Sequence, residues 1–201
     1  SILDHRHRAG VDLHEYIKIE IDMELEHAKA MVVGMGRSGF EAASFLIQRG
    51  AKVTISEMAG EDELGDAGRK LRDLGVRTEF GGHVMDTFTD TDFIVISPGV
   101  PHTIPPVRAA QEKGIPLMDE IELPYSFIKE PIIAVTGTNG KTTTTRLIGD
   151  MLEQSGQTVF VGGNIGNPLI SYLTGHEKAR HLVVEVSSFQ LDTITSFRPD
   201  I

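Results

Sequence analysis

Short apolar runs alternate with amphipathic segments from residue 29 onward, and each kind of segment predicts one kind of element. Apolar runs bounded by turn residues predict buried strands, whereas apolar residues repeated at a period of about 3.6 predict helices. In the first half of the chain we expect strands over 30–33, 52–57, 76–80, 92–96 and 115–118. Between them we expect helices over 40–48, 61–74 and 106–113, ended by Gly50, Gly75 and Gly114.

The alternation restarts at Pro131, with strands expected over 132–136, 158–161 and 181–186 and a helix over 141–154. Parallel neighbours need long crossovers, so strands that alternate with helices predict parallel sheets covered by helices. The expected fold class is therefore α/β, with a Rossmann-like parallel-sheet domain over 23–128 followed by an incomplete P-loop α/β domain over 129–201. We expect the second domain to be truncated, because a sheet of this kind needs more strands to cover its core.

Residues 1–22 do not share this pattern. Isoleucines alternate with charged residues over 17–22, which predicts a lone amphipathic strand. Met23 follows directly and could be the true start, with 1–22 as an extra N-terminal segment. We expect a monomer, with a dimer through 16–22 as the alternative if this strand pairs with a second chain.

The composition excludes several functional classes. The 201 residues include 19 Lys and Arg against 29 Asp and Glu, a formal net charge of -10 that argues against coating a nucleic acid. The absence of cysteine excludes disulfides, cysteine–zinc sites and thiol catalysis, and it fits a reducing compartment. No apolar run approaches the roughly 20 residues that span a bilayer, and the first residues lack the layout of a signal peptide. We therefore expect neither nucleic acid nor a membrane as a partner.

Residues 136–143, Thr-Gly-Thr-Asn-Gly-Lys-Thr-Thr, follow one expected strand and open an expected helix. Small residues in such a turn let consecutive main-chain N–H groups converge on phosphate oxygens at the helix N-terminus. Lys141 would add a positive charge, and the hydroxyl of Thr142 would bind Mg²⁺. Val135 stands where the usual P-loop pattern has its first glycine. The alternative is a glycine-rich turn whose lysine and threonines are only solvated.

Glu185 is the expected partner of this loop. It ends the apolar run 182–184, about where an acid that holds the Mg²⁺ of a nucleotide lies in phosphoryl-transfer sites. An isolated acid at the end of a strand would more often be a solvated edge residue or a helix cap.

An earlier turn, Gly34–Gly39, has the pattern G-x-G-x-x-G between a strand and a helix. Glu57 ends the next strand about 20 residues later, where an acid can meet a ribose. This turn predicts a nucleotide diphosphate beside residues 36–39 without identifying the nucleotide, and a tight turn without a ligand is the alternative. Ser97, Pro98 and Gly99 follow another strand at the same edge of the sheet, where ligands of open α/β sheets bind.

Five segments, taken in order, resemble the Mur ligase family: 96–100, 119–123, 136–143, 162–166 and 185–192. The resemblance runs from about Lys29 to the end of the chain and accounts for Val135, since the phosphate loop of this family lacks the first glycine. The last two segments resemble, among the ligases of the pathway, the member that adds D-glutamate. The family resemblance implies that the second domain is a Mur ligase central domain.

The resemblance implies a cytoplasmic bacterial enzyme of peptidoglycan synthesis that uses ATP and Mg²⁺. Such an enzyme phosphorylates the carboxylate of UDP-N-acetylmuramoyl-L-alanine, and the amine of D-glutamate then displaces phosphate from the acyl phosphate to form an amide. Lys141 and Glu185 would be catalytic, and Thr142 and Glu185 would hold the metal ion. The residues expected to bind ATP are Gly137, Thr138, Asn139, Gly140, Lys141, Thr142 and Thr143.

The resemblance also implies a site for the UDP substrate. Arg37 and Ser38 would bind the diphosphate with the glycine turn, Glu57 would contact the uridine, and 97–99 would flank the sugar. Asn164 would lie near the substrate and the metal ions, and Ser187 and Gln190 would shape the same cleft. The full set is Gly36, Arg37, Ser38, Glu57, Ser97, Pro98, Gly99, Asn164, Ser187 and Gln190.

The chain departs from the family pattern in places. Met58 and Ala59 stand where family members often carry a hydroxyl and a basic residue, and nothing in the family explains 1–22. A metal-binding histidine, a carbamylated lysine and the domain that binds D-glutamate would lie beyond Ile201, so the chain alone is expected to be inactive. Two alternatives remain, an NAD-dependent Rossmann oxidoreductase, which leaves the loop of Lys141 without a role, and a non-catalytic nucleotide-binding module.

Overall fold

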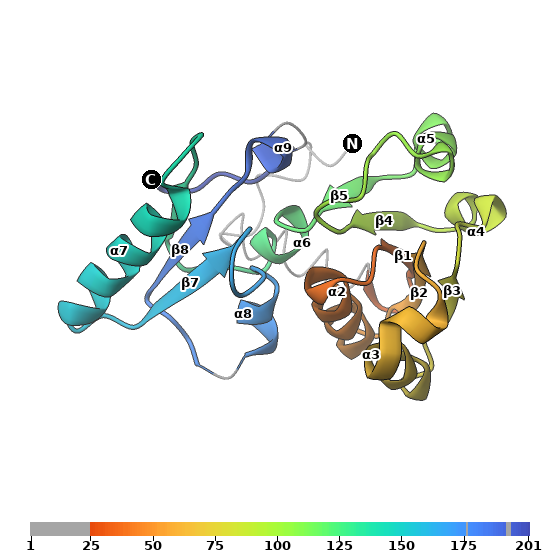
Figure 1. Ribbon diagram of the computed structural model, residues 1–201, viewed down its shortest axis with the longest axis horizontal. Helices are drawn as coiled ribbons and strands as arrows, with labels where there is room; N and C mark the ends of the chain where they lie inside the picture. The colour runs from red at the N-terminus through yellow and green to blue at the C-terminus, as the bar shows by residue number, and fades with distance from the viewer. Residues whose placement is uncertain (1–24, 176, 192–193) are drawn as a thin grey trace, which may run out of the picture.

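The computed structural model describes residues 25–175, 177–191 and 194–201, which form two parallel β-sheets (Figure 1). Hydrogen-bonded strands follow the order β3-β2-β1-β4-β5 in the larger sheet and β6-β8-β7 in the smaller one. The predicted fold class, a parallel α/β sheet followed by a second one, is confirmed. The segment 1–22, with its expected strand, lies outside the described residues. Within the described ranges, no helix combines the length and apolar character needed to cross a membrane.

The larger sheet has helices on both faces. Its strands are β1 (Lys29–Val33), β2 (Lys52–Glu57), β3 (Arg77–Phe80), β4 (Phe93–Ile96) and β5 (Leu117–Asp119). Its helices are α2 (Arg37–Gln48), α3 (Glu61–Asp73), α4 (Met85–Thr89) and α5 (Pro105–Glu112). Successive residues of a strand point to opposite faces, so Val32 packs in the core that α2 and α3 cover, whereas Val33 packs in the core that α4 and α5 cover.

The smaller sheet follows the larger one in sequence. Its strands are β6 (Ile132–Val135), β7 (Val159–Gly163) and β8 (His181–Glu185), and its helices are α7 (Lys141–Gln154), α8 (Ser171–Thr174) and α9 (Ser188–Leu191). The short helix α6 (Glu122–Tyr125) lies between the two sheets (Figure 1). Ile201 lies alongside β6, since its N–H donates to the carbonyl of Ile132 (3.3 Å) and its carbonyl accepts from the N–H of Ala134 (2.9 Å).

The first half of the chain carries the larger sheet and the second half carries the smaller one, and the two halves pack against each other around α8. Ile170 belongs to the core of the larger sheet, whereas its neighbour Leu169 belongs to the core of the smaller one. On the same interface, the hydroxyl of Thr174 donates to a carboxylate oxygen of Glu41 (3.1 Å). The residues 169–174 therefore join the part of the chain that carries the smaller sheet to the part that carries the larger one.

The strands and long helices agree with the sequence predictions to within a few residues. The largest shift at a helix start is at α2, which begins at Arg37 instead of residue 40, so that the helix includes the end of the glycine turn. The short helices α4, α6, α8 and α9 were not predicted, because elements of four or five residues are too short to show a helical period. The domain boundary expected after residue 128 stays a prediction.

Candidate functional site

The ends of three strands gather the candidate nucleotide-binding residues at one edge of the smaller sheet. Glu185 at the end of β8 is in register with Val135 at the end of β6 and with Gly163 at the end of β7. Because these strands are parallel, the residues that follow them emerge on the same side. The loop 136–140, Asn164 and Glu185 are thereby brought together. The position of Glu185 after an apolar strand led us to expect it beside the loop, and the family resemblance implied the same of Asn164.

The loop 136–140 is exposed and leads into the N-terminus of α7. Gly140 caps that helix in the left-handed conformation (φ 77), which a residue with a side chain rarely adopts. The Nζ of Lys141 reaches back over the loop and donates to the carbonyl of Gly137 (2.7 Å). The N–H groups of the first helical turn and the ammonium group together give this loop the donors that could bind an anion.

A hydroxyl, a carboxylate and an amide meet beside this loop. The hydroxyl of Thr142 donates to one oxygen of Glu185 (2.8 Å), and the side-chain amide of Asn164 donates to the other (3.4 Å). Glu185 is only 2% exposed. Oxygen donors of this kind suit Mg²⁺, which proteins commonly bind through one or two carboxylates together with substrate phosphates. Within the described residues, no group of three or more His, Asp or Glu side chains could hold a metal ion by itself.

A cavity of about 420 Å³ lies where the strand order of the larger sheet reverses, between β1 and β4. Such switch points are where open α/β sheets bind ligands. From the first half the cavity is lined by Gly34, Met35, Gly36, Arg37, Ser38, Glu57, Ser97, Pro98, Gly99 and Val100. From the second half it is lined by Gly163, Asn164, Ile165, Gly166 and Pro168. The structure thus places every residue expected to bind the UDP substrate in its wall, except Ser187 and Gln190.

The three motif glycines of the turn have different reasons to be glycine. A Cβ at Gly39 would lie 2.0 Å from the carbonyl oxygen of Gly34, and a Cβ at Gly34 would lie 2.9 Å from Val100. A Cβ at Gly36, by contrast, would meet no atom within 4 Å. Gly34 and Gly39 are therefore required by packing, whereas the missing side chain of Gly36 leaves its main chain open to the cavity.

Two polar side chains of the cavity wall hold the turn in place. The oxygens of Glu57 accept the main-chain N–H groups of Met35 (2.7 Å) and Ala59 (2.9 Å). The hydroxyl of Ser97 donates to the carbonyl of Gly34 (3.1 Å). A carboxylate oxygen has a second lone pair, so Glu57 can still accept a hydrogen bond from a hydroxyl group of a ligand. Its orientation is fixed by the protein before any ligand binds.

Arg37 crosses from one half of the protein to the other. Its guanidinium donates to the carbonyl of Gly166 (2.9 Å) and to the side-chain oxygen of Asn167 (2.7 Å). No local sequence pattern indicates this contact, since the partners lie about 130 residues apart. The expected contact of Arg37 with a diphosphate stays a prediction. These two bonds use two of the five N–H groups of the guanidinium, so the other three could donate to such a ligand.

Ser187 and Gln190 form the N-terminal cap of α9. The side-chain oxygen of Gln190 accepts from the N–H (2.9 Å) and the hydroxyl (3.1 Å) of Ser187, and the N–H of Gln190 donates back to that hydroxyl (3.2 Å). This is a capping box, and its pattern S-x-x-Q is visible in the sequence. The expected contact of these two residues with substrate stays a prediction.

Three acidic residues in the segment before and within α6 have distinct environments. Burial raises the pKa of Glu120 to about 7, and burial also raises the pKa of Asp119, whose carboxylate lies 3.0 Å from Nε2 of His102. Burial would raise the pKa of Glu122 as well, but donors at 195–197 together hold it below its ordinary value. This acidic stretch is part of the family resemblance, but its sequence pattern predicts no role for these three residues.

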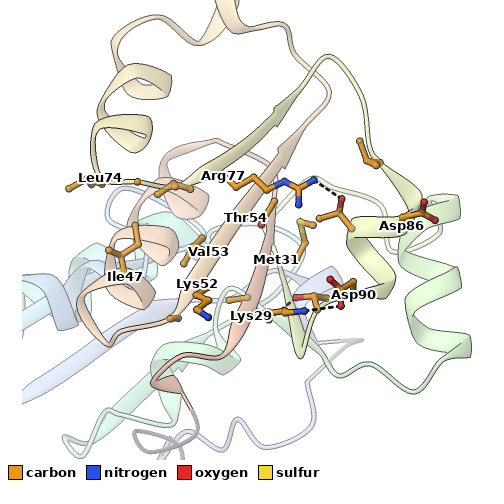
Figure 2. Close-up of a pocket in the computed structure, with 17 residues that line it drawn as sticks. Lys29, Met31, Ile47, Lys52, Val53, Thr54, Leu74, Arg77, Asp86 and Asp90 are labelled. Carbon is orange, nitrogen blue, oxygen red and sulfur yellow. Dashed lines mark hydrogen bonds and ion pairs between the residues drawn. The ribbon is translucent and has the colours of Figure 1, made fainter.

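A larger cavity, of about 710 Å³, lies at the opposite edge of the larger sheet, beside the amino-terminal ends of β1, β2 and β3 (Figure 2). Lys29 in its wall is paired with Asp90 (2.8 Å), and Arg77 donates to the hydroxyl of Thr87 (3.5 Å). None of the residues expected to bind ATP, metal or substrate lines it. Ligands of parallel sheets bind at the carboxyl ends of the strands, so we assign the candidate site to the smaller cavity.

Two family profiles match the chain in order. The Mur ligase MurD-like N-terminal domain matches residues 28–119, and the Mur ligase middle domain matches residues 135–201. The UDP-N-acetylmuramoylalanine–D-glutamate ligase of Desulfatibacillum aliphaticivorans is 55% identical over 89% of this chain and 40% of its own length. The protein of the same name from Desulfosudis oleivorans is 56% identical over 89% of this chain and 39% of its own length.

Among solved structures, the UDP-N-acetylmuramate–alanine ligase of Thermotoga maritima is 27% identical, with a TM-score of 0.48 over 80% of this chain and 37% of that chain. The chain spans about 40% of the length of the curated relatives it matches.

Proposed function

The chain belongs to the Mur ligase family, and we propose that it supplies the substrate-binding and nucleotide-binding parts of a ligase that joins D-glutamate to UDP-N-acetylmuramoyl-L-alanine. The proposal includes the division into a substrate domain over 23–128 and the first part of an ATP-binding domain over 129–201. It also includes a bacterial cytoplasmic setting, a monomeric state and D-glutamate as the second substrate.

The observation that carries the proposal is the position of Asn164. This residue lines the cavity at the glycine turn, and its side-chain amide also donates to Glu185 beside the phosphate loop (3.4 Å). The carboxylate end of a substrate held in the cavity would therefore lie near Thr142 and Glu185, the two residues proposed to hold the metal ion. A ligase of this kind needs that juxtaposition, because the substrate carboxylate must come close to the phosphate that activates it.

The residues of the loop fit ATP and Mg²⁺. When bound, ATP with Mg²⁺ would supply the phosphoryl group that turns a poorly reactive carboxylate into an acyl donor. The main-chain amides of 137–140 and Lys141 would bind the phosphates, and Thr142 and Glu185 would hold the metal ion. Lys141 and Glu185 thus act as catalytic residues by stabilising negative charge and by placing the metal ion.

The cavity wall fits a UDP-linked sugar. The open main chain of Gly36, with Arg37 and Ser38, would bind the diphosphate at the N-terminus of α2. Glu57 would accept a hydroxyl of the uridine part, and Ser97 with its neighbours Pro98 and Gly99 would lie along the sugar.

Calorimetric titration of the chain with UDP-N-acetylmuramoyl-L-alanine, ATP–Mg²⁺ and NAD tests the proposal. We expect binding of the first two and none of NAD. Lys141→Ala should lose ATP binding, while Lys113→Ala, which removes an exposed lysine at the end of α5, should bind ATP like the parent chain. Preference for NAD would replace the ligase with the oxidoreductase alternative, and absence of all binding would refute the proposal.

A further inference from the structure

Glu120 is a buried carboxylate in the segment that joins the two halves. It follows β5, is 3% exposed, and both of its oxygens accept hydrogen bonds from the second half. One oxygen accepts the main-chain N–H of Leu169 (3.1 Å), and the other accepts the side-chain NH₂ of Gln190 (3.2 Å). These two donors belong to the segments that follow β7 and β8, the strands that end at Gly163 and Glu185.

The bond from Gln190 to Glu120 determines which way the amide of Gln190 points. A side-chain amide has an oxygen that only accepts and an NH₂ group that only donates. Because Glu120 accepts from the NH₂ group, the oxygen is turned toward Ser187, where it accepts both the main-chain N–H and the hydroxyl. If the amide of Gln190 were reversed, its NH₂ group would face the main-chain N–H of Ser187, and these two donors could not form a hydrogen bond.

Simple joining of the two halves does not explain a carboxylate at this position. Removing a charged group from water costs several kcal/mol, so an apolar side chain of similar size would often join two halves at a lower cost. What an apolar side chain lacks is the ability to accept two donors at once. Glu122 offers a comparison on the same segment, since it accepts donors from 195–197 and has no hydrogen bond to 169 or 190.

We propose that Glu120 is a positioning residue for the candidate site, because its double acceptance fixes the orientation of the Gln190 amide and the main chain at Ser187, beside Glu185. Through Leu169 the same carboxylate anchors the segment that carries Asn164. The consequence for substrate binding rests on the function proposed above, whereas the positioning itself does not.

The test replaces the acceptor and then restores the pattern of donors. The side chain of Glu120→Gln has one oxygen that accepts and one NH₂ group that donates. That NH₂ group must therefore face either the N–H of Leu169 or the NH₂ group of Gln190, and two donors meet. In the double variant Glu120→Gln with Gln190→Glu, the new amide accepts from Leu169 and donates to the new carboxylate, which still accepts from Ser187. At pH 8, where Glu120 is ionised and both of its oxygens can accept, we expect hydrogen exchange at the N–H of Ser187, measured by NMR, to be about tenfold faster in the single variant. The rate should return toward the parent value in the double variant.

Glu122→Gln is the matched control. It should lower the melting temperature, yet leave the native-state exchange of Ser187 and the affinity for UDP-N-acetylmuramoyl-L-alanine unchanged. The affinity of Glu120→Gln for that compound should fall about tenfold, corresponding to one buried hydrogen bond lost.

Unchanged exchange at Ser187 in Glu120→Gln, or exchange in the double variant as fast as in the single one, would overturn the positioning role. If Glu120→Gln does not fold, the double variant is compared with Gln190→Glu, in which two carboxylates face each other. Exchange at the N–H of Ser187 should then be faster in Gln190→Glu than in the double variant. A parent chain that does not bind the UDP compound while the exchange rates change as expected would refute the proposed function and leave the positioning role standing.

Discussion

Gly36→Ala is the most direct test of the cavity, because the protein itself does not require glycine at this position. The backbone at Gly36 (φ -67, ψ -175) is open to alanine, and the added Cβ would meet no atom within 4 Å. Alanine restricts the unfolded chain, which stabilises the protein by about 0.4–1 kcal/mol. Gly36 also caps α2, where alanine is worse than glycine by about 0.5–1 kcal/mol. The two effects offset, so we expect the free energy of unfolding to stay within about 0.5 kcal/mol of the parent value.

Ligand binding should respond very differently. A phosphate that approaches the main chain at Gly36 would meet the new methyl group and lose a hydrogen bond. A hydrogen bond to a charged group contributes about 1.5–3 kcal/mol, so the affinity for UDP-N-acetylmuramoyl-L-alanine should fall about 10- to 100-fold. Titration calorimetry measures this affinity, and urea unfolding measures the stability.

Gly60→Ala is the control for this experiment. Gly60 caps α3 with similar backbone angles (φ -70, ψ 158), and it does not line the cavity. It should therefore reproduce the small effect on stability without any effect on affinity. Equal affinity of Gly36→Ala and the parent chain would show that no ligand approaches this turn, and the assignment of the diphosphate to it would be withdrawn.

The remaining predictions concern packing, the phosphate loop and pH. Gly39→Ala should lower the free energy of unfolding by at least about 2 kcal/mol, because its Cβ would lie 2.0 Å from the carbonyl oxygen of Gly34; a parent-like urea midpoint would contradict this. Lys141→Ala should keep the parent affinity for the UDP compound while it loses ATP, since Lys141 does not line the cavity; calorimetry showing equal loss of both would refute the separation of the two sites. Burial raises the pKa of Glu120 from 4.5 to about 7, so the folded protein holds a proton there that the unfolded chain releases between these values. Stability should therefore be greater at pH 5 than at pH 8 by about 2.5 kcal/mol from this group, and urea unfolding of Glu120→Gln should lack that decrease.

The sequence predicted the sheets and both glycine turns because each depends on local pattern. An apolar strand followed by small residues and a helix specifies the loop of Lys141 within a few residues, and the end of a strand specifies Glu185. The contacts of Arg37 and Glu120 could not be predicted in the same way. Each joins residues far apart in the chain, and their partners are determined by how α6 and α8 pack between the sheets.

The sequence also could not separate the reasons for the glycines in the turn. Gly34, Gly36 and Gly39 look alike in the motif, but only the structure shows which of them a neighbouring atom excludes from having a side chain. The capping box of Ser187 and Gln190 is the opposite case. Its spacing was readable from the chain, and the acid that orients it was visible among the motif residues, but no local pattern connects the two.

Because the guanidinium of Arg37 is already fastened to Gly166 and Asn167, any anion that uses its remaining N–H groups would be held by both halves of the protein at once. Ligand binding and the contact between the two halves would then stabilise each other. A substitution that weakens only the contact between the halves would therefore also lower the affinity for the ligand.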